Sequence, residues 1–198
     1  HREKMMPAIG TAMLAQHKMR TYYYGNFEGF ANKPGEPDKR RWEAFTHQPR
    51  IGQNYVGLRN RLTILSEAYS YLDFRRRVEV TEAFVQEILE YSAAHGAAMA
   101  RLANQVDLDT IRRAVTGPQL QMGVEYELKP LAKPVEILVG EVTKVKNPRS
   151  GRDMSVMVED KVTPMMMQDW GLFAAKRTVT TARAYILRRE EGTRVVIE

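Results

Sequence analysis

The sequence has no cysteine among its 198 residues, which excludes disulfide bonds, thiolate metal sites and cysteine nucleophiles. It also lacks long hydrophobic runs. No apolar stretch approaches the roughly 20 residues that a membrane-spanning helix needs, and the longest candidate, around Leu62 to Leu65, has only the length of a strand. We therefore expect no membrane span. The 43% hydrophobic content is typical of a globular protein with a real core.

A continuous basic stripe is also missing, although the net charge is +6. The basic residues fall in short clusters separated by acidic ones, at 39–41, 75–77 and 188–189, which is typical of a solvated surface. Nucleic-acid binding would need basic residues interleaved with stacking aromatics, and only Arg20 to Tyr24 weakly offers them. We expect no nucleic-acid partner; steeply salt-dependent binding to generic DNA would show the opposite.

The first part of the chain predicts two helices and a buried strand. Apolar residues recur at three- and four-residue steps from Glu3 to Arg20, which indicates an amphipathic helix. The segment 31–41 contains two prolines and a glycine and is expected to be a loop. Leu62 to Leu65 predicts a short buried strand. A second helix is expected from Thr81, as its N-cap, to Ala94, with Gly96 ending it and a further helical stretch capped by Asp107 or Asp109.

The composition changes at Gly117 and Pro118, where strand-like runs replace helical periodicity. We therefore predict two units, residues 1–116 and residues 117–198, the second one rich in β-structure. Its expected strands are 124–128, 135–145, 154–158 and 177–187, with a last element at 193–197. The run from Asn147 to Gly151 predicts a tight turn between two of them.

One stretch, from Trp42 to Tyr91, has a more specific pattern. It contains NYVGLRNR at 54–61, then TILSE at 63–67, then FRRRV at 74–78 and the helix that follows. In this order and spacing it resembles the closing part of the catalytic domain of the zinc carboxypeptidase (carboxypeptidase A-like) family. The strand-like runs at 134–139 and 183–187 resemble the β-rich extension of bacterial members. The resemblance implies an α/β fold: a partial carboxypeptidase-like α/β/α sheet domain followed by a small β-rich domain.

The resemblance also implies roles for four residues. Glu67 would be the general base, which takes a proton from zinc-bound water and delivers it to the leaving amine. Tyr55 would be the mobile tyrosine that closes over the substrate, although it lies closer to the glutamate than is usual in the family, so the tyrosines at 22, 23, 24, 69 and 71 stay open as alternatives. Arg59 and Arg61 could clamp a substrate carboxylate, but the family's carboxylate-binding residues normally precede this segment. Without the resemblance, Glu67 is equally an exposed acid or an ion-pair partner of these arginines.

The zinc ligands that the family requires are not found in this sequence. None of the four histidines has a glutamate in the family's His-Glu spacing. The resemblance therefore implies a zinc cofactor held by residues upstream of His1, a peptide substrate, and a need for the rest of the catalytic domain. The sequence itself leaves the location open, and only the resemblance favours a secreted or periplasmic one. His47 is a further residue that could approach the cleft.

We thus hold two main hypotheses. In the first, the chain supplies the general base of a metallocarboxypeptidase and is inactive alone. In the second, it is a non-catalytic binding or assembly module, and Glu67 can be replaced without consequence. A third, the basic nucleic-acid binder, is less favoured by the charge pattern.

Overall fold

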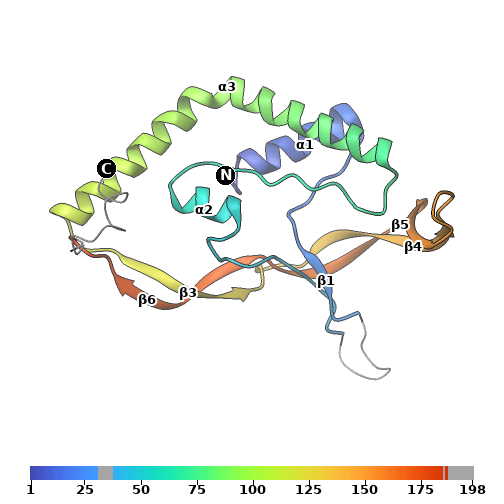
Figure 1. The fold of residues 1–198 in the computed structure, drawn as a ribbon. Helices are drawn as coiled ribbons and strands as arrows, with labels where there is room; N and C mark the ends of the chain where they lie inside the picture. The colour runs from blue at the N-terminus through green and yellow to red at the C-terminus, as the bar shows by residue number, and fades with distance from the viewer. Residues whose placement is uncertain (31–37, 185, 187–198) are drawn as a thin grey trace.

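The computed structural model describes residues 1–30, 38–184 and 186. Over these residues the chain has a mixed α/β structure with three helices and six strands. The long helix α3 runs along one side of an elongated molecule, with α1 beside it, and the strands form ribbons on the opposite side (Figure 1). The α/β class expected from the sequence is confirmed in this general form.

Helix α1 (Met5–His17) confirms the first predicted helix. Its buried side chains are Met5, Ile9 and Met13, which are four residues apart and therefore share one helical face. The helix ends at Lys18, which has a left-handed backbone with φ of 57°, and the next residue, Met19, donates its N–H to the Met13 carbonyl at 3.2 Å. This short, one-sided helix can be stable only by packing against a partner.

Helix α3 (Phe74–Val115) has 42 residues and is much longer than the predicted helix from 81 to 94. It begins after Asp73, whose carboxylate accepts a hydrogen bond from the Arg76 amide at 3.0 Å. The expected N-cap Thr81 instead lies inside the helix, where its hydroxyl donates to the Arg77 carbonyl. Gly96 does not end the helix, because one internal glycine costs only about 1 kcal/mol. Asp107 and Asp109 cap no new helix, since both lie within α3.

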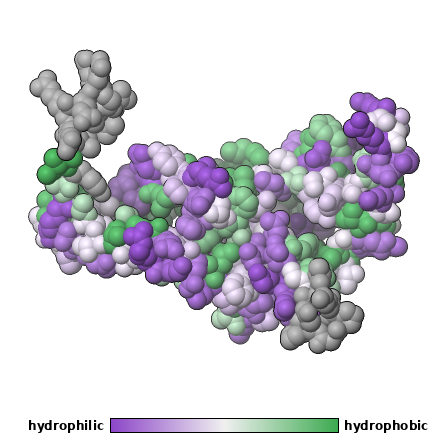
Figure 2. All heavy atoms as spheres, turned by 60° about the horizontal axis from the view of Figure 1, so that its bottom comes forward, coloured by the Kyte–Doolittle hydropathy of each residue, from purple (hydrophilic) through white to green (hydrophobic). Residues whose placement is uncertain are grey.

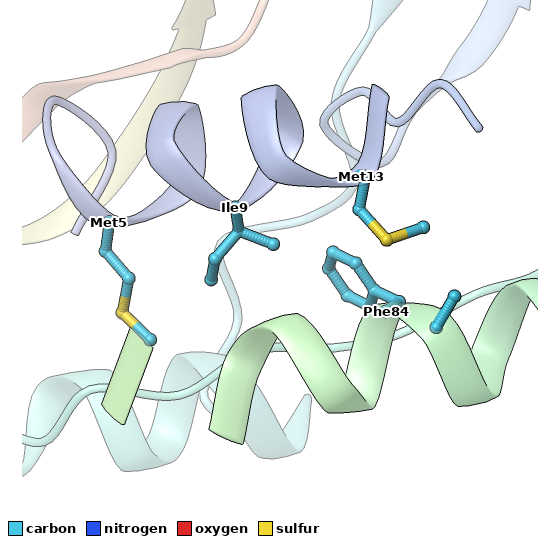
Figure 3. Close-up of a cluster of buried hydrophobic side chains, with 5 residues drawn as sticks. Met5, Ile9, Met13 and Phe84 are labelled. Carbon is cyan, nitrogen blue, oxygen red and sulfur yellow. The ribbon is translucent and has the colours of Figure 1, made fainter. Parts of the chain in front are cut away.

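The largest hydrophobic core lies between α1 and α3. Met5, Ile9 and Met13 point from α1 towards α3, and Phe84 points back from α3 (Figure 3). A polar contact joins the same two helices: the buried Glu87 carboxylate lies 2.8 Å from His17 Nε2. The two helices therefore form one unit, held by apolar burial and by this polar contact.

The strands form two sheets. In the first, the order is β1 (Asn26–Glu28), β2 (Arg41–Glu43), β5 (Asp153–Trp170), β4 (Val135–Lys146). The second pairs β3 (Gln121–Lys129) with β6 (Leu172–Thr180) in antiparallel register. Strand β2 runs parallel to β5, with Trp42 opposite Asp169. Strands from before and after residue 116 therefore belong to one sheet. The change from helix to strand nevertheless falls close to the predicted division, because α3 ends at Val115 and β3 begins at Gln121.

Most strands after residue 120 confirm the predictions, with changed boundaries. β3 and β4 cover the predicted segments 124–128 and 135–145. β5 is much longer than predicted, and β6 begins five residues before Arg177. The turn is confirmed, because the Asn147 amide donates to Arg152 and Gly151 has a φ of +65°. The predicted element at 193–197 lies outside the described residues.

The predicted strand at Leu62 to Leu65 is wrong. This segment is extended but pairs with no strand among those described. Leu62 and Ile64 pack instead against the core between α1 and α3. The predicted burial is also only partial, since Leu62 and Ile64 are half-buried and Leu65 is 45% exposed. An apolar run of four residues cannot tell a sheet partner from a helix partner.

Much apolar surface lies exposed. The accessible surface is 15162 Å², whereas a compact monomer of 22.7 kDa would expose about 9,500 Å². Apolar atoms lie between charged ones across the face shown in Figure 2. Over the residues that the structure describes, no helix has the length and apolar character needed to cross a membrane.

Candidate functional site

Glu67 lies at an open depression of about 660 Å³. One wall is the extended segment Ser66 to Ala68, and the other is the first two turns of α3. The segment is held near α3 because Leu62 and Ile64, a few residues earlier, are anchored in the core. The depression is lined by Ser66, Glu67, Ala68, Phe74, Arg77, Val78, Thr81 and Glu82.

The Glu67 side chain is exposed and has no hydrogen-bond or ion-pair partner among the residues described. An ion pair with Arg59 or Arg61, the structural alternative considered for this glutamate, does not form. The carboxylate is therefore free to accept a proton or to contact a ligand. The structure places it within the irregular segment between α2 and α3, and not at the end of a strand as predicted.

The first turns of α3 bring one cation and one further anion to the same depression. Arg77 lies beside the Phe74 ring, with 5.9 Å between the guanidinium carbon and the ring centroid. Its Nε atom is buried and has no hydrogen-bond partner within the described parts of the chain. Glu82 lines the depression as an exposed carboxylate. The surface thus combines apolar groups with charges of both signs.

Arg61, a predicted substrate-binding residue, contacts α3 instead of the depression. Its guanidinium lies 2.8 Å from the Asp107 carboxylate, which also accepts a hydrogen bond from the Asn60 side chain at 3.1 Å. These contacts lower the pKa of Asp107 and raise that of Arg61. Arg61 therefore fastens the segment after α2 to the long helix.

Tyr55 and Arg59 contact each other on α2 (Gly52–Leu58) and its C-terminal end. Arg59 Nη1 donates to the Tyr55 hydroxyl at 3.2 Å, and both groups are exposed. Neither residue lines the depression. The structure therefore does not bring Tyr55, Arg59 and Arg61 together with Glu67.

The other tyrosines considered for the substrate-covering role do not line the depression either. The Tyr22 hydroxyl donates to the buried Asp169 carboxylate at 2.7 Å, and the Tyr23 hydroxyl donates to the Arg2 carbonyl at 2.8 Å. Tyr69 and Tyr71 pack edge to face, with 5.3 Å between the ring centroids. Tyr24 packs on Phe45 in the same way.

The histidines are spread over different elements. His17 pairs with Glu87, His47 lies 5.2 Å from the Tyr126 ring, and His95 lies 4.3 Å from the Tyr91 ring. Within residues 1–30, 38–184 and 186, no three histidine or carboxylate side chains are grouped as metal ligands. The described residues therefore do not form a zinc site by themselves.

Sequence reasoning did not identify Arg77, Thr81 and Glu82 as lining residues. The signal that could have found them is the spacing after Asp73: as an N-cap it starts α3 early and places residues 74, 77, 78 and 81 on one side of the helix. The comparisons with known proteins add no family: no family model, no curated protein and no solved structure matches this chain.

Proposed function

We propose that this chain is part of a zinc-dependent metallocarboxypeptidase, to which it supplies Glu67 as the general base. The proposal starts from the resemblance of the segment 42–91 to that family. One observation carries it further: the Glu67 carboxylate is exposed, unpaired among the described residues and located at a depression large enough for an amino-acid side chain. An acid serving only stability would be expected in a local ion pair, like Asp107.

In this function Glu67 removes a proton from the attacking water and transfers it to the amine that leaves when the peptide bond breaks. General acid–base catalysis of this kind contributes about 10²- to 10⁴-fold to a rate. The zinc ion would be held by residues outside this chain and would polarise the scissile carbonyl. In the family's fold the catalytic carboxylate lies at the end of a rigid strand. In this proposal, residues 62–65 would become such a strand by pairing with strands from the rest of the catalytic domain.

The test uses hydrolysis of a blocked dipeptide in the presence of zinc. We expect no turnover from the chain alone. In the protein that includes the residues encoded before His1, Glu67→Gln should lower kcat by about 10²- to 10⁴-fold, whereas the control Glu28→Gln, an exposed glutamate of β1, should leave it unchanged. Hydrolysis by the chain alone, or full activity of Glu67→Gln, would contradict the proposal.

A second candidate function is a binding or assembly module. The observation in its favour is the large exposed apolar surface, which includes Phe74, Leu89, Ile111 and Val115 along α3. In this function the protein exists mainly in complexes, and Glu67→Gln has no effect on catalysis of any partner. Sedimentation of the purified chain measures its self-association. Because part of a peptidase could also self-associate, the result must be combined with the activity test to separate the two candidates.

A further inference from the structure

The outer edge of β4 has no partner strand among the described residues. The first sheet ends at β4, whose other edge is bonded to β5. The β4–β5 ribbon extends past the start of α3 to one end of the molecule (Figure 1), and every residue from Glu141 to Lys146 is exposed. The extra residues at the bulge of this ladder, 158–161, lie on β5, so β4 keeps a regular alternation. An unpaired edge of 12 residues offers its N–H and C=O groups to another strand.

One face of β4 carries a pattern that is complementary to its own reverse. Residues two positions apart share a face of a strand, so one face holds the alternate residues Glu136, Leu138, Gly140, Val142 and Lys144. In chain order this face presents an anion, an apolar side chain, a glycine, an apolar side chain and a cation. Leu138 is 37% exposed and Val142 is 39% exposed. A second β4 that runs in the opposite direction would therefore place a matching group opposite each of these residues.

Lys144 differs from the neighbouring lysines of the ribbon. Lys146 pairs with Asp153 at 2.6 Å, and Lys161 pairs with Glu141 at 3.1 Å. Lys144 has no carboxylate partner among the residues that the structure describes. Its ammonium group is therefore available to a carboxylate from outside this chain.

We propose that two copies of this chain pair antiparallel through their β4 edges, around a two-fold axis at Gly140. Glu136 of each copy then lies opposite Lys144 of the other, and Leu138 lies opposite Val142. Because the axis repeats every contact, the dimer gains ion pairs and apolar pairs on both sides of it, and such cross-strand pairs stabilise a sheet. The accessible surface of 15162 Å² exceeds the roughly 9,500 Å² of a compact monomer by more than a standard interface of about 1,600 Å² requires.

Neighbouring registers fit this edge less well. An axis at Glu141 places that carboxylate opposite its own copy, and like charges directly opposite each other are destabilising. An axis at Val139 places Glu136 opposite Val142, where the carboxylate meets no cation. The register around Gly140 is therefore the one that the pattern of β4 favours.

Sedimentation equilibrium of the full chain measures the dimer dissociation constant. Lys144→Glu should raise this constant by about tenfold, because it turns each ion pair into a contact between like charges. The control Lys4→Glu changes the net charge equally at an exposed lysine ahead of α1 and should leave the constant within about twofold. Far-UV circular dichroism should show that both variants are folded.

Mixing two variants tests the charge pairing itself. Glu136→Lys alone should also dimerise weakly, since it places a second lysine opposite Lys144. When Glu136→Lys and Lys144→Glu are mixed, both charge pairs of the heterodimer have opposite signs, so it should form with about the dissociation constant of the wild type. The contact of Glu136 with Arg20 at 3.2 Å lies within one chain, so its loss affects the monomer and the dimers equally.

The absence of cysteine from the sequence allows disulfides to report the register. Directly opposite Cβ atoms of an antiparallel pair lie about 4.5–5.5 Å apart, so a small shift brings them within disulfide range. A mixture of Leu138→Cys and Val142→Cys should therefore give a covalent dimer under oxidation. Each variant alone should not, because identical positions lie about 14 Å apart along the strand. Gly140 cannot carry the cysteine, because an added Cβ would lie 2.9 Å from Met157 Sδ.

The inference would be overturned by a monomeric wild type, by equal dissociation constants for Lys144→Glu and Lys4→Glu, or by no gain in covalent dimer on mixing the cysteine variants. Association through the exposed apolar side chains of α3 would give the second of these results. The dimer is independent of the proposed function: Glu67→Gln should leave its dissociation constant unchanged, and a monomeric chain would leave the outcome of the peptidase test open to either result.

Discussion

The helical unit and the β-ribbons of this molecule are stabilised in different ways. Between α1 and α3, five apolar side chains form a buried cluster. In the long β4–β5 ladder only Ile137 and Met167 are buried hydrophobic residues, so much of its order comes from backbone pairing. A two-stranded ribbon is only marginally stable in water without a packed face. We therefore expect the helical unit to contribute more to the free energy of unfolding, and the stability of the ribbons to depend on their contacts with that unit.

The largest expected effect is in the helical unit. Ile9→Ala removes a side chain that is 1% exposed and should lower the free energy of unfolding by about 2–5 kcal/mol, because it leaves a cavity. Chemical denaturation measures the loss. The control Leu14→Ala, on the same helix but half-exposed, should cost much less. Hydrogen exchange should show lost protection in α1 and α3 before β4 and β5; an equal loss everywhere would remove the distinction between the two regions.

An intermediate effect is expected where the two regions meet. Tyr22 donates to the buried Asp169 of β5 at 2.7 Å, and Arg2 binds the Gly171 carbonyl at 2.7 Å. Tyr22→Phe should lower the free energy of unfolding by about 1–2 kcal/mol, since the Asp169 carboxylate loses its shortest hydrogen bond. The control is Tyr24→Phe, a comparably exposed tyrosine that packs on Phe45. Equal stability of the two variants would mean that this contact does not join the regions.

The same contact predicts a dependence on pH. Burial, and then the hydrogen bond to Asp169, raise the pKa of Tyr22 above its ordinary value of 10.0. The folded state therefore keeps the phenol proton where the unfolded chain loses it. The stabilisation is complete below pH 10 and falls as the pH rises above it. Unfolding measured from pH 8 to 11 should show this fall in the wild type and a smaller one in Tyr22→Phe; parallel profiles would contradict the assignment.

The smallest effect is expected in the ribbons. Gly151 has a φ of +65° in the β4–β5 turn, and no atom would meet an added Cβ within 4 Å. Gly151→Ala should therefore cost about 1 kcal/mol, the low end of the range for backbone strain, because no contact is lost. Gly52→Ala, also with open space but without a positive φ, should be neutral or slightly stabilising. Thermal unfolding compares the two; a large loss from Gly151→Ala would show that the ribbon matters more to the whole than its sparse core suggests.

The parts of the fold that could be predicted were those set by local patterns. The three- and four-residue spacing of Met6, Ile9, Met13 and Leu14 predicted α1, although the structure buries Met5 with Ile9 and Met13 and leaves Leu14 47% exposed. The turn chemistry at 147–151 predicted the hairpin. The length of α3 was not predicted, because Thr81 and Gly96 carry the usual signals of helix ends yet are overridden by Asp73 and by continuous helical residues. The parallel pairing of β2 with β5 joins residues more than 120 positions apart, and no local pattern encodes such a partner.

The candidate site shows the same limit. Glu67 was identified through its sequence neighbours, and the structure places it at a depression. Arg61 was expected near it, but the sequence does not say that Asp107, 46 residues later, competes for its guanidinium. Arg77 was overlooked because in RRR at 75–77 all three arginines look alike; only the positions of Glu79 and Phe74 around the helix distinguish it. The spacing in the sequence identifies candidate charged residues. Which of these side chains remain without an ion-pair partner depends on residues from other parts of the fold.

The continuity of α3 has a mechanical consequence. At 1.5 Å per residue, its 42 residues have a contour length of about 63 Å, and the helix bends along its course (Figure 1). One end forms a wall of the Glu67 depression, and at the other end Arg183 binds the Val115 carbonyl at 2.7 Å, close to where β3 and β6 meet. Because one continuous helix joins both places, a partner bound at the far end of α3 would act on the wall beside Glu67 without touching it.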